Sequence, residues 1–192
     1  MKGAALRLRF LDREERVPLR KGGRLILIAV GKAAAPMAAE AHRLLGPRIA
    51  AGLVVTKQGF ASADVPFPLL EAAHPVPDES GVAAAEAVAK RVQGLRPDDL
   101  LLVLVSGGAS ALLPAPLPGI SLADKQQLVD VMLRTEMDIH EINRVRKAVS
   151  RIKGGGLAAL AAPARVVGLY LSDVPGDELA SIGSGPTVPN PV

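Results

Sequence analysis

Three polar or glycine-containing segments follow three predicted strands of this 192-residue chain. They begin at Gly31-Lys32, at Ser106-Gly107 and at Ser172-Asp173. In an open parallel sheet the carboxyl ends of the strands lie at one edge, and such sheets bind ligands there. We therefore expect these three segments to converge on one site.

The second of these segments, residues 106–110, has the composition of an anion-binding loop. Two adjacent glycines, Gly107 and Gly108, let backbone N–H groups turn towards a ligand and approach it closely. Ser106 and Ser110 add hydroxyl groups to the same loop. We expect this loop to bind the oxygen atoms of a phosphate or a carboxylate.

Lys32 and Asp173 are the candidate catalytic residues. Lys32 lies at the start of a predicted helix, where the helix dipole and the lysine charge both attract an anion. The alternative is an exposed lysine without a ligand. Asp173 is placed to hold Mg²⁺ or to act as a general base. Its alternative is a turn aspartate that accepts hydrogen bonds from its own backbone.

A basic group lies further along the chain, at Arg144, Lys147 and Arg151. The i, i+3, i+7 spacing puts these side chains on one face of a helix, and Asn143 and Lys153 flank them. This face either adds positive potential to the site or is simply solvated, and the spacing alone favours the solvated face.

Two other segments favour structural interpretations. His74, which precedes a proline after a predicted strand, is interpreted as a hydrogen-bonded structural residue. Residues 181–187 are rich in glycine and serine, and their composition favours an ordered linker over a second anion-binding loop.

The composition excludes several classes of function. Cysteine is absent, which removes disulfides, thiolate nucleophiles and cysteine-ligated metals, and aromatic residues make up only 2%, which argues against nucleic-acid stacking. A small anionic substrate explains the net charge of +4 as well as a nucleic acid would. Neither phosphate-loop nor dinucleotide glycine fingerprints are present.

The uncharged residues 100–123 are interrupted by glycines and prolines, so we expect no membrane span and a cytoplasmic protein.

The elements that position these residues alternate between strands and helices. Alternating apolar residues near the N-terminus predict a small antiparallel hairpin. Apolar runs predict strands at residues 25–30, 53–55, 69–73, 100–105 and 166–171. Helices are predicted at residues 32–45, 80–92 and 122–134, and from Asp138 to about residue 152. This order predicts an α/β fold with a mostly parallel sheet.

Seven motifs, taken in order, resemble the N-terminal domain of the bacterial and archaeal glycerate 2-kinases. The family also includes members labelled as hydroxypyruvate reductases. The motifs are VGKAA at 30–34, HPVPD at 74–78, SGGASALL at 106–113, NRVRK at 143–147, SRIKGG at 150–155, LSDVPGD at 171–177 and SGPT at 184–187. Because they cover nearly the whole chain in order, the match is far more specific than one glycine loop.

The resemblance implies a Rossmann-like, three-layer α/β/α domain that comprises residues 1–192 of a two-domain enzyme, with the second domain absent from this sequence. It implies ATP- and Mg²⁺-dependent phosphorylation of D-glycerate at its 2-hydroxyl, in a cleft between the domains. Lys32 then corresponds to the essential lysine and Asp173 to the acidic residue, acting directly or through Mg²⁺. The remaining candidates for binding substrate or phosphate are Ser106, Gly107, Gly108, Ser110, Asn143, Arg144 and Arg151.

Two other functions remain open. An NAD(P)H-dependent hydroxypyruvate reductase fits the family labels, but the missing dinucleotide fingerprint counts against it. A partial, inactive ligand-binding domain is the third interpretation. The expected partners are glycerate and a nucleotide, without nucleic acid or membrane, and the sequence leaves a homodimer open.

Overall fold

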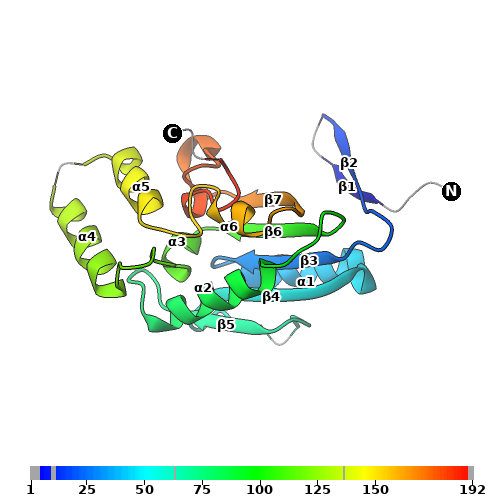
Figure 1. The fold of residues 1–192 in the computed structure, drawn as a ribbon, viewed down its shortest axis with the longest axis horizontal. Coiled ribbons are helices and arrows are strands. Elements are labelled where there is room, and N and C mark those ends of the chain that lie inside the picture. The colour runs from blue at the N-terminus through cyan, green and yellow to red at the C-terminus, as the bar shows by residue number, and fades with distance from the viewer. Residues whose placement is uncertain (1–4, 10–11, 63, 136, 190–192) are drawn as a thin grey trace.

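Five parallel strands form the central sheet of the computed structural model, which describes residues 5–9, 12–62, 64–135 and 137–189 (Figure 1). Their order across the sheet is β5-β4-β3-β6-β7. The strands are β3 (Leu25–Val30), β4 (Ile49–Lys57), β5 (Leu69–Ala72), β6 (Leu100–Ser106) and β7 (Arg165–Leu171). Counted along the chain within this sheet, the order is the 3-2-1-4-5 of a Rossmann-like half, and the direction of winding reverses between β3 and β6.

The two central strands are buried on both faces, as their unbroken apolar runs predict. Every residue of β3 and of β6 is buried. Alternate residues of these strands belong to two separate hydrophobic clusters, one on each face of the sheet. The apolar runs therefore reflect a sheet covered by other elements on both sides.

Small side chains let the helices approach this sheet closely. Helix α1 (Ala34–Leu45) buries Ala34, Ala38 and Ala41 against one face. Helix α2 (Glu79–Val92) packs against the other face, with α3 (Ala109–Leu112) and α6 (Gly156–Leu160) (Figure 1). A core of Ala, Val, Leu and Ile therefore fills three layers with few aromatic residues, and the expected α/β/α fold is confirmed.

The N-terminal hairpin is also confirmed. Strands β1 (Ala5–Arg9) and β2 (Glu14–Pro18) pair antiparallel, with Leu6 opposite Val17. Leu6 is buried and joins the same hydrophobic cluster as α1, so the hairpin extends the layer on that face of the sheet.

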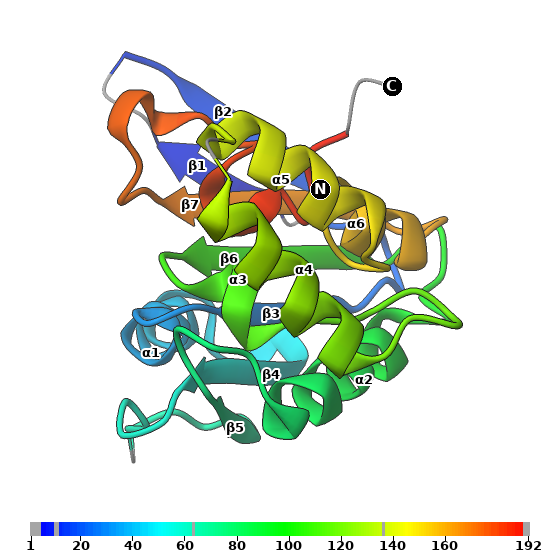
Figure 2. The same ribbon diagram turned by 90° about the vertical axis from the view of Figure 1, so that its left-hand side faces the viewer.

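Two further helices lie beyond the carboxyl ends of the strands (Figure 2). Helix α4 (Leu122–Arg134) begins with a capping box of Ser121 and Asp124, and α5 (Ile139–Ala148) begins with one of Asp138 and Glu141. Helix α5 ends four residues earlier than predicted, because the chain after it pairs with the segment that follows α3. The Arg151 N–H donates to the carbonyl of Ala115 at 3.0 Å.

The chain after β7 folds back onto the domain instead of forming a linker. The N–H groups of Gly154 and Gly155 donate to the carbonyls of Ser184 and Gly185, at 2.9 and 2.8 Å. Ile182, in the short 3₁₀ turn η3 (Ile182–Ser184), is 1% exposed. The prediction of an ordered linker is therefore wrong, because this segment buries apolar surface and forms one wall of the cavity described below.

No helix in the described part of the chain has both the length and the apolar character required to cross a membrane.

Candidate anion-binding site at the carboxyl edge of the sheet

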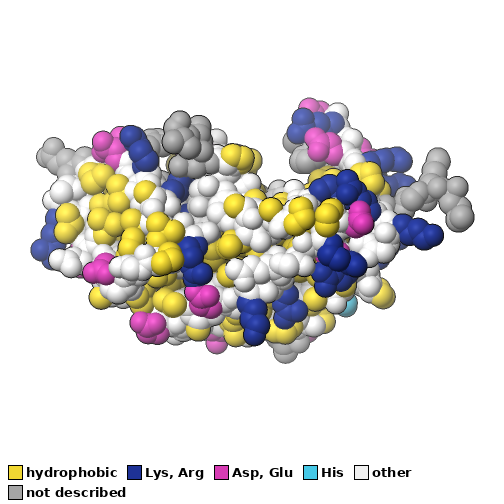
Figure 3. Space-filling model, in the orientation of Figure 1, with side chains coloured by type: hydrophobic (Ala, Val, Ile, Leu, Met, Phe, Trp, Pro, Cys, Tyr) yellow, Lys and Arg dark blue, Asp and Glu magenta, His cyan; other side chains and the backbone are white. Residues whose placement is uncertain are grey.

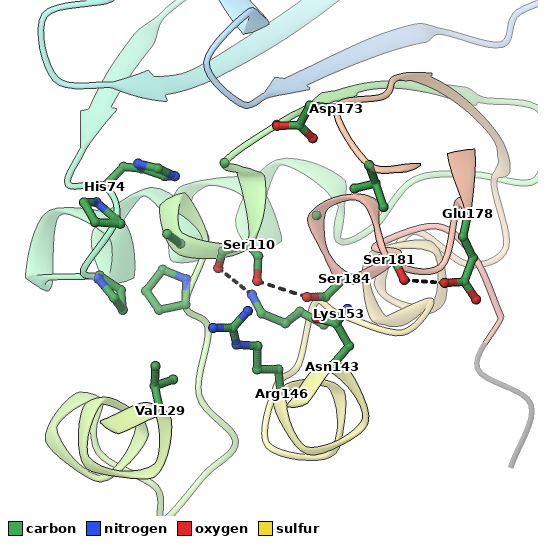
Figure 4. Close-up of a pocket in the computed structure, with 18 of the residues that line it drawn as sticks. His74, Ser110, Val129, Asn143, Arg146, Lys153, Asp173, Glu178, Ser181 and Ser184 are labelled. Carbon is green, nitrogen blue, oxygen red and sulfur yellow. Dashed lines mark hydrogen bonds between the residues drawn. The ribbon is translucent and has the colours of Figure 1, made fainter. Parts of the chain in front are cut away.

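A cavity of about 580 Å³ opens at the carboxyl edge of the sheet (Figure 4). It is bounded by the segments after β5, β6 and β7, by α4 and α5, and by the segment around η3. The polar and glycine residues that line it are His74, Gly107, Gly108, Ser110, Lys125, Asn143, Arg146, Lys153, Asp173, Glu178, Ser181, Gly183 and Ser184. The structure thus brings strand exits and distant helices to one place.

The loops after β6 and β7 meet at Gly107 and Asp173. A Cβ atom built on Gly107 would lie 2.0 Å from Oδ2 of Asp173, so this carboxylate occupies the space that any side chain at position 107 would take. Within the described residues, the carboxylate accepts no hydrogen bond and forms no ion pair. Its oxygens are therefore available to a ligand in the cavity.

The loop after β3 joins the same cluster. The Lys32 N–H donates to the carbonyl of Gly107 at 2.9 Å. Gly108, in the left-handed conformation (φ +87°), turns its open side towards Lys32 and His74. A Cβ atom there would lie 3.3 Å from Cε of Lys32 and 3.0 Å from Cδ2 of His74. The predicted convergence of the three strand exits is thus confirmed, although Lys32 lies beside the cavity rather than among the residues that line it.

His74 takes a larger part in this site than the sequence indicated. Burial lowers the pKa of its imidazole, and the positive charges of Lys32 and Lys57 lower it further, while Asp173 opposes the shift. A lowered pKa keeps His74 neutral near pH 7. A neutral imidazole beside a lysine and a carboxylate offers the cavity both a hydrogen-bond donor and an acceptor.

Ser106 is a structural residue here, contrary to the expectation that it binds substrate. It is 2% exposed, and its hydroxyl accepts the Ala33 N–H at 3.0 Å. Gly31 is the reason for this close packing, since a Cβ atom at that position would lie 2.2 Å from the Ser106 hydroxyl oxygen. The serine therefore fixes the start of α1 behind Lys32.

The other residues of the loop do face the cavity. The N–H groups of Gly107 and Gly108 donate to no acceptor within the described residues. The Ser110 hydroxyl lies 3.0 Å from that of Ser184, which joins the loop to the segment around η3 (Figure 4). The loop thus presents free backbone donors and a hydroxyl pair.

Three cationic side chains that the sequence analysis did not assign to the site meet in the cavity wall. We call Lys125, Arg146 and Lys153 the cation cluster; they come from α4, from α5 and from the loop before α6. Lys125 donates to the carbonyl of Pro114, and Lys153 donates to the carbonyl of Ser110 at 2.8 Å. Within the described residues, none of the three cations has an acidic partner.

Burial lowers the pKa of all three groups, and repulsion from neighbouring cations adds to the shift of the two lysines. Burial and the nearby Arg146 lower the pKa of Lys125 to about 8. Burial, followed by the charges of Lys125 and Arg146, lowers the pKa of Lys153 well below its ordinary value. Burial also lowers the pKa of Arg146. The cavity wall is therefore a region of uncompensated positive charge.

One signal in the sequence indicated Lys125. It stands in the apolar stripe of α4, with Leu122, Val129 and Met132 at helical spacing. A lysine on the core-facing side of an amphipathic helix is uncommon unless it has a partner or a function.

The two predicted arginines lie elsewhere. Arg144 is exposed and does not line the cavity. Arg151 pairs with Glu86 and donates to the carbonyl of Pro116 at 3.1 Å. The expectation that Arg144 and Arg151 share a helix face is wrong, because α5 ends at Ala148. Asn143, in contrast, is 6% exposed and lines the cavity.

A magnesium ion fits this site only with ligands from a substrate. No group of three or more metal-binding side chains occurs in the described ranges. Asp173 supplies one carboxylate with free oxygens, and Mg²⁺ is commonly held by one or two carboxylates together with phosphates and water. The donor set is thus suited to a metal that arrives with a phosphorylated ligand.

The fold and this site define a Rossmann-like α/β domain with a cavity at its switch point that is lined by basic side chains and by glycine and serine residues. Figure 3 shows basic side chains scattered over the visible face rather than massed in one patch. Residues 3–192 match the domain of unknown function DUF4147, and the chain belongs to that family.

Relatives with descriptive names support the resemblance found in the sequence. The chain is 45% identical over 184 residues to the D-glycerate 2-kinase of Thermotoga maritima, covering 94% of this chain and 44% of that protein. It is 46% identical over 175 residues to a "Putative hydroxypyruvate reductase" of Agrobacterium vitis, covering 91% and 40%. The crystal structure of glycerate kinase from T. maritima superposes with a TM-score of 0.85 at 46% identity, covering 88% and 41%.

The match to the glycerate kinase and hydroxypyruvate reductase family is therefore confirmed. The chain spans 40–44% of the length of these curated relatives.

Proposed function

We propose that this domain contributes the phosphoryl-transfer site of an ATP-dependent kinase that phosphorylates D-glycerate at its 2-hydroxyl. The observation that carries the proposal is the arrangement at the sheet's switch point. There the Asp173 carboxylate lies against Gly107 and has no hydrogen-bond or ion-pair partner within the described residues. Lys32 lies against Gly108. The similarity to proteins named glycerate kinases supplies the substrate and the nucleotide.

Phosphoryl transfer depends mainly on positioning and on the neutralisation of charge. In the proposed site, Lys32 offsets the charge on the transferring phosphoryl group or orients the glycerate carboxylate. The free N–H groups of Gly107 and Gly108 bind a phosphoryl oxygen.

Asp173 orients the 2-hydroxyl and accepts its proton as the oxygen attacks. Asp173 is also the residue that would hold Mg²⁺ together with the substrate phosphates, and the metal would supply charge neutralisation there. Neutral His74 lies beside both Lys32 and Asp173. Its imidazole donates a hydrogen bond to the reacting groups or accepts one from them.

A second domain forms the opposite wall of the cleft in this proposal. The position of the cavity supports this arrangement, because the cavity opens at the carboxyl edge of the sheet, where a second domain would cover it. The chain's coverage of about two fifths of its relatives agrees with this arrangement.

The test measures ADP release with ATP, Mg²⁺ and D-glycerate, and identifies the product by phosphorus NMR. Lys32→Ala and Asp173→Asn are compared with Arg144→Gln, whose side chain is exposed on α5. We expect both site variants to lose at least 100-fold in kcat/KM, with the control unchanged. Full activity in Lys32→Ala and Asp173→Asn would exclude the assignment.

The same preparation tests the reductase alternative through oxidation of NADH with hydroxypyruvate. Turnover there without any ADP release would replace the kinase proposal.

A further inference from the structure

Arg146 and Asn143 present two polar groups without protein partners to the cavity. They are one turn apart on α5, and both line the cavity wall (Figure 4). Within the described residues, neither the Arg146 guanidinium nor the Asn143 amide makes a hydrogen bond, although Asn143 is 94% buried. Their polar atoms are open to the cavity, where a ligand or water can supply the hydrogen bonds that the protein does not.

Lys125 and Lys153 are held behind this pair. Lys125 donates to carbonyls of Pro114 and Val149, and Lys153 donates to those of Ser110 and Leu113. These contacts fix both ammonium groups in place without neutralising their charges. The two lysines of the cluster are therefore preorganised to bind a ligand.

The chemistry of the wall favours phosphate over carboxylate. It provides the donors of Arg146, the amide N–H groups of Asn143 and the remaining N–H groups of the lysines, against few acceptors. A carboxylate brings one negative charge, whereas a phosphate group brings up to two and accepts from several donors at once. A hydroxy acid would also need acceptors for its hydroxyl groups.

The cluster and the transfer site occupy different parts of the cavity. Figure 4 shows Asp173 on one side, with Arg146 and Asn143 on the other, and Ser110 and Ser184 between them. A chain of linked phosphates can extend from one part of the cavity to the other, whereas a three-carbon acid cannot.

We propose that the cation cluster, with Asn143, is a second phosphate-binding position, which holds phosphates of a polyphosphate ligand whose end lies at Lys32 and Gly108. Under the proposed function, on which this part rests, that ligand is the triphosphate of ATP, and the cluster binds its non-transferred phosphates. The phosphate-binding position itself does not depend on the reaction.

The test uses inorganic tripolyphosphate as the probe, with this chain as the protein. Calorimetry measures its affinity for wild type, Arg146→Gln and the matched control Arg144→Gln. We expect Arg146→Gln to bind tripolyphosphate about 10- to 100-fold more weakly, as for the loss of a charge-assisted hydrogen bond, and Arg144→Gln to bind as wild type. Equal weakening in both variants would show non-specific charge attraction and would overturn the proposal.

Thermal unfolding provides a second readout, in which Arg146→Gln changes the Tm without ligand and the Tm increase caused by the ligand in opposite directions. Removing one of three uncompensated cations relieves repulsion, so we expect Arg146→Gln to raise the Tm without ligand while reducing the increase that tripolyphosphate produces. This result also shows that the variant folds. An unchanged response to tripolyphosphate in Arg146→Gln would refute the proposal.

D-Glycerate distinguishes the sources of the anion. We expect its affinity to be unchanged by Arg146→Gln, and a loss of glycerate affinity without a loss of tripolyphosphate affinity would make this a carboxylate site and overturn the proposal. If Lys32→Ala and Asp173→Asn keep full kinase activity while tripolyphosphate binding still depends on Arg146, the assignment of the transfer site to Lys32 and Asp173 fails and this inference stands.

Discussion

Replacing Gly107 with alanine perturbs the candidate site through one identifiable contact. The new Cβ atom would lie 2.0 Å from Oδ2 and 2.6 Å from Cγ of Asp173, about 1 Å inside the shortest contact that real Cβ atoms make. Gly107 does not have the positive φ of Gly108, so its backbone accepts alanine. The Asp173 carboxylate must therefore move by about 1 Å or more.

Two magnitudes follow from this displacement. A misplacement of about 1 Å in a catalytic group costs on the order of 100-fold in rate, equivalent to about 2.7 kcal/mol. Forcing the Asp173 side chain off its preferred rotamer costs about 0.5 to 1.5 kcal/mol of unfolding free energy. The second effect is measurable even where the chain by itself shows no turnover.

A double-mutant cycle isolates this contact. Urea unfolding is measured for wild type, Gly107→Ala, Asp173→Ala and the double variant. We expect Gly107→Ala to destabilise wild type by about 0.5 to 1.5 kcal/mol. When Asp173 is alanine, we expect the same change to be neutral or stabilising by up to about 1 kcal/mol, because the clash is gone and alanine restricts the unfolded chain. Equal effects of Gly107→Ala in both backgrounds would refute the reasoning.

Three further predictions concern stability and pH. Asp99 is buried and accepts hydrogen bonds from Arg24, which hold its pKa well below the usual value. Asp99→Asn should therefore cost about 2 to 3 kcal/mol in urea unfolding at pH 7, and this difference should shrink below about pH 4, where the unfolded chain takes up the proton. The pKa of Lys125 is about 8 in the free protein, and a bound anion raises it. The affinity for tripolyphosphate should therefore fall as pH rises through about 8. Calorimetric titrations over a pH series should show a flatter dependence of affinity on pH in Lys125→Met. Ile182→Ala should cost about 2 to 5 kcal/mol of unfolding free energy, whereas the control Leu179→Ala, whose side chain is 48% exposed, should change it by less than about 0.5 kcal/mol.

Much of the fold follows from local patterns in the sequence. The runs that became β3 and β6 are apolar at every position, which is typical of strands buried on both faces. Ser121 and Asp138 begin their helices with the capping boxes that their sequences allow. Strands that alternate with helices, in turn, predict that Lys32, Gly107 and Asp173 lie at one sheet edge.

The assignment of basic residues failed where it depended on helix phase and helix length. Successive residues of an α-helix are rotated by about 100°, so Arg144 and Arg146 point in nearly opposite directions. The spacing within the sequence does not say which of them faces the cavity. Arg151 lies beyond the last turn of α5, because Ser150 pairs with Pro116 in a strand-like bridge that only the folded chain can form.

The sequence by itself determined the parallel sheet and the edge of it at which Lys32, the glycine loop and Asp173 meet, because both depend on local periodicity and on the direction of strands. Only the tertiary structure decided the chemistry of the cavity wall that carries the cation cluster. Lys125, Arg146 and Lys153 come from three separate parts of the chain. Their charges affect one another only when packing buries them together around one cavity. Burial and charge repulsion depend on distances in space, which the spacing of residues along the chain does not encode.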